Sequence, residues 1–259
     1  MPAVNRGTYV RLFGLMILLT IVQSVIMLIP DWNGTQGSAE AADIDRLLDV
    51  MIVISCFVFA VVIVMLGYCI HAFRAKPGDE SDGKPVHGNT RLEIAWTVIP
   101  TIIVLFGGAY SWIVLDDIEA EAANQLPLEV TAQQFKWTFD YPEQDVTSDE
   151  LHVPVDTQLD VSLTALDVLH SFWVPEWRIK RDLVPISESN PTDVDNSFVV
   201  TPNRVGTYSL ICTELCGFGH ATMQAKVVVH TQEDFDAWVA EQEPASGDAA
   251  GSAEGGSGS

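Results

Sequence analysis

Three long apolar segments interrupt an otherwise strongly acidic chain, and they restrict where the remainder can fold. About 20 apolar residues in a helix span the ~30 Å hydrocarbon core of a bilayer. The segments cover residues 12–29, 47–70 and 94–115. The second and third are predicted to be membrane helices. The first follows Arg6 and Arg11 and precedes the small residues Ala39 and Ala41, so it fits either a cleaved secretory signal or an uncleaved helix.

The charge outside these segments limits the possible partners. The chain has 35 acidic against 13 basic side chains, and its formal net charge of -22 argues against nucleic acid as a partner. Apolar residues nevertheless make up 48% of the chain, which excludes a disordered acidic protein. A very acidic surface with little lysine predicts a protein that works in high salt, where ions screen its self-repulsion.

Basic residues between the second and third segments set the orientation in the membrane. The loop over residues 71–93 carries four of them, whereas residues 31–45 are acidic. The four are Arg74, Lys76, Lys84 and Arg91. The positive-inside rule places the 71–93 loop in the cytoplasm. All residues after Asp116 are therefore predicted to lie outside the cell membrane.

The outer part of the chain has the pattern of an all-β domain. Five short runs alternate apolar and polar residues and are separated by turn-forming residues, which predicts a β-sandwich or Greek-key barrel. These runs begin at Leu128, Leu159, Ser197, Thr207 and Gln224. Residues 232–241 are predicted to form a closing helix that carries Phe235 and Trp238.

Four parts of the chain are expected. Residues 1–41 are a signal peptide or an N-terminal membrane segment, and residues 42–116 are a transmembrane hairpin. Residues 117–242 form the extracytoplasmic β domain. Residues 243–259 are a Gly, Ser and acidic tail with too few apolar residues to fold.

A run of metal-binding side chains lies near the end of the predicted β domain. Residues 212–223 read Cys-Thr-Glu-Leu-Cys-Gly-Phe-Gly-His-Ala-Thr-Met. Thiolate, thioether and imidazole together are the ligand set that suits copper. Cys212 and Cys216 could instead form a disulfide outside the cell, but that would give His220 and Met223 no role.

The second cysteine indicates more than one copper ion. A mononuclear blue-copper site needs one Cys, two His and a weak axial Met. Two thiolates can instead bridge two copper ions, each bound by one histidine. His170 would supply the second imidazole, and Met223 and the backbone carbonyl of Glu214 the remaining weak ligands. His152 and His230 have no donor neighbours in the sequence and are predicted to be structural.

At this point the chain closely resembles subunit II of haem-copper cytochrome oxidases, from the second apolar segment to about Trp238. The run from Cys212 to Met223 carries the resemblance, together with Asp167-Val-Leu-His170 before Val174-Pro175 and with Glu93-Ile-Ala-Trp96-Thr97-Val-Ile-Pro100. The resemblance, with the acidic composition, leads us to expect a halophilic archaeon as the source.

The resemblance implies a two-helix hairpin that anchors a cupredoxin-like Greek-key barrel with a dinuclear CuA centre. Carried over to this chain, the copper ligands are His170, Cys212, Glu214 through its carbonyl, Cys216, His220 and Met223. It also implies a magnesium ion shared with subunit I, bound by the Glu214 carboxylate. Glu93 matches a carboxylate near the mouth of a proton pathway, although an acid at a helix start is also favoured by the helix dipole.

The resemblance further implies a terminal oxidase that reduces oxygen to water, with its catalytic residues in subunit I and subunit III as a further partner. Phe135 stands where the family commonly has the Trp through which electrons enter, and we expect it to act with Trp137. The soluble donor is therefore either a cytochrome c or a small blue-copper protein. The alternative function is the copper-bearing subunit of a nitric oxide reductase, since the catalytic subunit decides between the two.

Overall fold

The computed structural model describes residues 5–30, 32–75, 77–78, 85, 87–185 and 196–242. The chain divides into two compact units. One contains the long helices. The other contains Thr35–Ala42 together with the chain from Ile118 onward. The tail that the sequence predicts over residues 243–259 lies outside the described residues.

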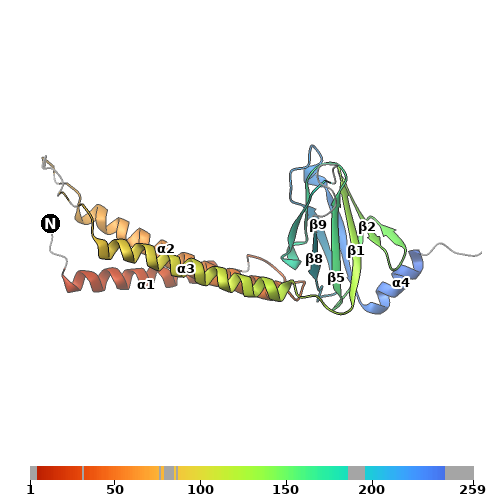
Figure 1. The fold of residues 1–259 in the computed structure, drawn as a ribbon, viewed down its shortest axis with the longest axis horizontal. Helices are drawn as coiled ribbons and strands as arrows, with labels where there is room; N and C mark the ends of the chain where they lie inside the picture. The colour runs from red at the N-terminus through yellow and green to blue at the C-terminus, as the bar shows by residue number, and fades with distance from the viewer. Residues whose placement is uncertain are drawn as a thin grey trace, which may run out of the picture. The chain divides into compact units, whose positions relative to one another are not determined.

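The first unit consists of apolar helices (Figure 1). Within the described part of the chain, three helices are long and apolar enough to cross a membrane. They are α1 (Arg6–Leu28), α2 (Ala41–Ala72) and α3 (Thr90–Ile118). The two predicted membrane helices are confirmed and extend beyond their predicted bounds. The first apolar segment is also a full helix, so the region is not limited to a hairpin.

The second unit is a sandwich of two β-sheets (Figure 1). Among the described residues each sheet has five strands, ordered β3-β2-β1-β5-β8 and β4-β10-β9-β6-β7. The first sheet comprises β1 (Gln125–Gln133), β2 (Lys136–Tyr141), β3 (Val146–Ser148), β5 (Gln158–Ala165) and β8 (Ser197–Val200). The second comprises β4 (Leu151–Pro154), β6 (His170–Trp173), β7 (Lys180–Leu183), β9 (Gly206–Cys212) and β10 (Gln224–His230).

Alternating side chains of both sheets enclose one hydrophobic core. Strands β1 and β5 run parallel with Val130 opposite Leu163, and the apolar residues of each strand are buried at every second position. This is the period of two that a half-buried strand requires. The aromatic residues of β2 fill the centre, with Trp137, Phe139 and Tyr141 almost fully buried. The predicted β-sandwich is therefore confirmed.

The segment between the first two helices, Thr35–Ala42, is built into the β unit, and we call it the inter-helix segment. The Gly37 N–H donates to the Glu176 carbonyl at 2.8 Å, and the Ala39 N–H donates to the Thr201 carbonyl at 2.9 Å. Both carboxylate oxygens of Glu40 accept the Thr201 N–H, at 3.0 and 3.1 Å. Because Ser38, Glu40 and Ala41 are buried, this segment is part of the domain's packing.

The closing helix α4 (Gln232–Gln242) packs over His152 and His230, which are far apart in the sequence. His152 Nδ1 lies 2.8 Å from His230 Nε2, and the His152 ring stacks on Trp238 with centroids 4.2 Å apart. These histidines have no donor neighbours in the sequence, but parallel pairing of β4 with β10 places them side by side, where each is the other's neighbour. The pKa of each imidazole is lowered, and burial is the largest cause.

Candidate metal centre

The metal-binding run forms the loop between β9 and β10, at one end of the sandwich. Cys212 is the last residue of β9, and the loop returns through the short 3₁₀ helix η2 (His220–Thr222). The Cys212 N–H donates to the Met223 carbonyl at 3.1 Å, which closes the base of the loop. His170 begins the neighbouring strand β6, which pairs with β9 through Phe172 and Cys212. Sheet pairing therefore brings His170 to the loop.

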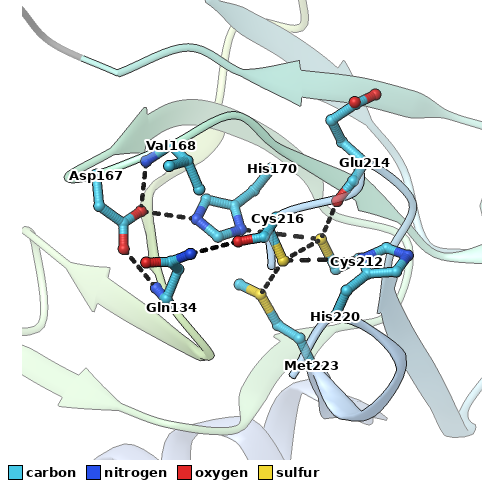
Figure 2. Close-up of polar contacts among 9 residues, drawn as sticks. All are labelled: Gln134, Asp167, Val168, His170, Cys212, Glu214, Cys216, His220 and Met223. Atoms are coloured by element: carbon cyan, nitrogen blue, oxygen red, sulfur yellow. Dashed lines mark hydrogen bonds and ion pairs between the residues drawn. The ribbon is translucent and has the colours of Figure 1, made fainter. Parts of the chain in front are cut away.

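The two sulfur atoms form the middle of the site (Figure 2). Cys212 Sγ and Cys216 Sγ lie 3.8 Å apart, and both thiols are free. A disulfide requires about 2.05 Å between its sulfur atoms. The structure therefore has no disulfide between Cys212 and Cys216.

Each sulfur has one imidazole and one weak donor beside it. Cys212 Sγ lies 3.9 Å from His170 Nδ1 and 3.3 Å from the Glu214 carbonyl oxygen. Cys216 Sγ lies 3.7 Å from His220 Nδ1 and 3.7 Å from Met223 Sδ. The six predicted copper ligands thus converge in two matching groups.

The chemistry and burial of these donors fit copper. His170, Cys212 and Cys216 alone place three ligand atoms within 4.8 Å of one another. Met223 and His170 are fully buried, so the site is shielded from water. Soft sulfur with imidazole nitrogen favours copper over hard cations such as magnesium. The residues present therefore suit the metal that the sequence predicts.

Hydrogen bonding fixes which nitrogen of His170 can bind a metal. His170 Nε2 lies 2.9 Å from Asp167 Oδ1. An ionised carboxylate only accepts, so Nε2 carries the proton and Nδ1 presents its lone pair toward Cys212. Burial of Asp167 acts to raise the pKa of its carboxyl group. The hydrogen bonds from the Gln134 N–H, His170 and the Val168 N–H outweigh burial, so the pKa is lowered.

The Cys216 thiol needs a nearby cation to ionise at neutral pH. Burial, followed by the neighbouring Cys212 sulfur, raises the pKa of the Cys216 thiol to about 11. A thiol in this state is protonated at neutral pH, whereas a metal ligand must be a thiolate. Metal binding at this site is therefore expected to release protons.

The two aromatic residues predicted for electron transfer have different positions. Phe135 is 40% exposed at the β1–β2 turn and lies against Gly217 and Gly219 of the metal-binding loop. Trp137 is buried, with its ring centroid 6.4 Å from that of His170. Phe135 is therefore open to a docking partner, while Trp137 packs between the core and the site.

Two further predicted residues lie apart from the sulfur atoms. The Glu214 carboxylate points away from the sulfurs, although its carbonyl contacts Cys212 (Figure 2). Glu93 is in the first turn of α3, and its carboxylate accepts the Asn89 N–H at 3.0 Å. The Asn89 side chain accepts the Leu92 N–H in return, so Glu93 completes a reciprocal cap of this helix.

Sequence reasoning missed Gln134 and assigned no role to Asp167. The Asp-x-x-His spacing could have indicated a carboxylate that orients a ligand histidine. Nothing in the sequence near Gln134 indicates its contact with Cys216, because the two residues are 82 positions apart.

A two-sheet sandwich with a sulfur and histidine site at one end, attached to apolar helices, is the arrangement of a membrane-anchored cupredoxin. The family comparisons agree. The model of the cytochrome c oxidase subunit II transmembrane domain matches residues 34–114, and that of the periplasmic domain matches residues 143–231. The chain belongs to the cytochrome c oxidase subunit II family.

Individual relatives cover most of the chain. Cytochrome c oxidase subunit 2 of Synechocystis sp. is 30% identical, over 88% of this chain and 83% of the relative. The protein of the same name from Thermostichus vulcanus is 32% identical, over 83% and 81%. The solved periplasmic domain of subunit II of a Bradyrhizobium japonicum cytochrome oxidase is 25% identical, with a TM-score of 0.41, over 48% of this chain and 96% of that one.

Family membership confirms several predictions. The chain is a subunit of a haem-copper oxidase, its copper-type domain lies outside the membrane, and its partners are other subunits of the complex. The nitric oxide reductase alternative is not favoured. The predicted halophilic archaeal source stays a prediction.

Proposed function

We propose that the outer domain holds two copper ions between the sulfur atoms of Cys212 and Cys216. His170 and His220 would each bind one ion, and the Glu214 carbonyl and Met223 would complete the site. The observation that carries this proposal is the pair of matching groups, in which each sulfur has its own imidazole Nδ1 at 3.9 or 3.7 Å. A mononuclear site would leave one of the two groups without a purpose.

When bound, the copper pair supplies a one-electron acceptor and donor. The chain's own residues hold it in a rigid environment. The β9–β10 loop is closed at its base by the Cys212 N–H bond to the Met223 carbonyl, and the Thr213 N–H is bonded to the Ser171 carbonyl at 3.1 Å. A loop fixed at both ends changes little when the charge of the site changes, which suits electron transfer.

The surface around Phe135 is the proposed docking place of the soluble electron donor. Phe135 is exposed and touches the metal-binding loop, and Leu215 and Phe218 of that loop are also exposed. An apolar contact between donor and acceptor excludes water and favours close approach. Trp137, buried beside His170, would lie on the inner side of the path that electrons take from the donor to the metal centre.

A small blue-copper protein is the proposed donor, with a cytochrome c as its competitor. The support is Phe135, an apolar ring without the indole N–H that the family commonly places here. Reduction rates of the purified complex with each donor decide between them. A strong preference for cytochrome c contradicts this part of the proposal.

The remaining roles follow from the same family relationship. Electrons would pass to haem in subunit I, where oxygen is reduced to water, and subunit III would complete the complex. The Glu214 carboxylate would bind magnesium shared with subunit I, and Glu93 would serve the proton pathway there. We also propose residues 42–116 as the membrane anchor and residues 117–242 as the copper domain, with residues 1–41 as the N-terminal segment and residues 243–259 as a tail.

Metal analysis with electron paramagnetic resonance tests the central proposal. We expect two copper ions per chain in the protein purified with its partner subunits, with one unpaired electron shared by both nuclei. Zinc, a single copper ion with a mononuclear spectrum, or an oxidised cystine at residues 212 and 216 would overturn it.

A further inference from the structure

The turn between β1 and β2 contacts the metal-binding loop at its backbone. This turn carries Gln134, whose side-chain Nε2 donates a hydrogen bond to the carbonyl oxygen of Cys216 (Figure 2). The next residue along the loop, Gly217, has a φ of 132°, a value that residues with side chains rarely adopt. The Gln134 amide therefore fixes the peptide group at which the loop turns away from Cys216.

The backbone of the same residue contacts the other half of the site. The Gln134 N–H donates to Asp167 Oδ2 at 2.7 Å. The second oxygen of Asp167 accepts from His170 Nε2 at 2.9 Å and from the Val168 N–H at 2.7 Å. Gln134 is thus linked to Cys216 through its side chain and to His170 through its backbone and Asp167.

The neighbouring Phe135 makes the fit between turn and loop close. A Cβ atom at Gly217 would lie 2.7 Å from Gln134 Nε2, and one at Gly219 would lie 2.5 Å from Phe135 Cδ2. Both distances are shorter than a real carbon can adopt, so the loop packs on this turn only because glycine occupies both positions. The turn and the loop are therefore closely packed against each other.

We propose that Gln134 is a positioning residue of the metal centre, because it joins the Cys216 half of the site to the His170 half. It does not bind metal itself. It sets the direction of the Cys216 peptide and, through Asp167, supports the orientation of the His170 ring, while holding Phe135 against the loop. This inference rests on the proposed function for the identity of the metal, but the geometry it describes belongs to the chain alone.

The test compares Gln134→Leu with Gln133→Leu in the full chain purified in detergent. Gln133 is the adjacent exposed residue, so the control removes the same amide at a position that faces solvent. The first readout uses metal-free protein, in which peptide mapping with fragment sequencing measures the alkylation rate of Cys216 separately from those of Cys56, Cys69 and Cys212. We expect faster alkylation of Cys216 in Gln134→Leu and no change in the control.

The second readout is copper affinity, measured by competition with a chelator. Loss of a residue that orients metal ligands typically weakens binding by about 10-fold to 100-fold, and we expect a loss of this size for Gln134→Leu. Gln134→Glu keeps the side-chain length but replaces the donating amide with an acceptor, so it separates the hydrogen bond from shape. We expect it to weaken binding at least as much.

Wild-type values of Cys216 alkylation and copper affinity in either Gln134 variant would overturn the inference. Failure of the wild-type chain to take up copper would instead overturn the proposed function, and the alkylation readout on metal-free protein would still judge the role of Gln134. The two failures are therefore distinguishable.

Discussion

Cys212 Sγ and Cys216 Sγ lie 3.8 Å apart, too far for a disulfide and close enough for both to contact the same two metal ions. The four-residue spacing alone does not produce this separation. It results from a loop that leaves β9 at Cys212 and turns back through Gly217.

Replacement of either cysteine should abolish the shared-spin signal. Serine keeps the shape of cysteine but is a hard oxygen ligand, which copper binds poorly beside imidazole and thioether. We expect Cys212→Ser and Cys216→Ser to lose the dinuclear spectrum and turnover with the soluble donor. Paramagnetic resonance checks this, with Cys69→Ser, an exposed membrane-helix cysteine, as the control. An unchanged spectrum in both site variants would disprove the assignment.

A methyl group at Gly219 should disturb Phe135. The added Cβ would meet Phe135 Cδ2 at 2.5 Å, while the backbone φ of -90° at Gly219 is one that alanine accepts. The ring must therefore move, at a cost of about 1–3 kcal/mol in folding free energy, and reduction by the soluble donor should slow. Thermal unfolding and donor stopped-flow kinetics measure the two effects. The double variant Gly219→Ala/Phe135→Ala should recover the stability if the clash is the cause.

The stability of the β domain should depend on pH through His152 and His230. The pKa of each imidazole is lowered in the folded protein, so the unfolded chain binds more protons below its ordinary pKa of about 6.5. Stability is then fully present above that pH and is lost as the pH falls through the lowered pKa values. Glu150 partly opposes the shift at His152, and Asp234 opposes it at His230.

Thermal unfolding of the full chain between about pH 7.5 and 5 measures this dependence, since that range brackets the ordinary imidazole pKa. His230→Gln should flatten the curve, whereas His87→Gln, at an exposed position, should leave it unchanged. An equal pH dependence in His230→Gln and wild type would contradict the prediction.

Removal of the Glu40 carboxylate should destabilise the β domain. Glu40 is 8% exposed and both of its oxygens accept the Thr201 N–H, so Glu40→Ala leaves a partly buried donor without this partner. The expected cost is about 1–3 kcal/mol of unfolding free energy. Asp43→Ala, which removes only the exposed ion pair with Arg46, is the control and should change stability by less than about 1 kcal/mol. Calorimetric unfolding of the full chain compares the two.

The mature chain is expected to retain the inter-helix segment. Cleavage after Ala41, where the small residues suggest a signal site, would remove the backbone groups that bond to Glu176 and Thr201. Intact-mass measurement of the purified protein checks this. A mature N-terminus at Ala42 with an unchanged unfolding temperature would show that the segment is dispensable.

Much of the fold was predictable because it depends on local pattern. Alternation identified β1, β5, β8, β9 and β10, and hydropathy identified the membrane helices. Strands β2, β3, β4, β6 and β7 were not identified. Four of these have only three or four residues, a length at which alternation is easily missed, although it did reveal the four-residue β8. The inter-helix segment was assigned to the N-terminal region, since its pairing with residues near Thr201 leaves no mark on its own composition.

The sequence by itself determined which chemistry this protein can perform, because its soft ligands lie within one run and its apolar segments have the length of a bilayer. Only the tertiary structure decided how the ligands meet. His170 reaches Cys212 across 42 positions through the pairing of β6 with β9, and Gln134 reaches Cys216 across 82. Such contacts depend on strand register and on the packing of one loop against another. Neither leaves a pattern in the short stretch of sequence around each residue.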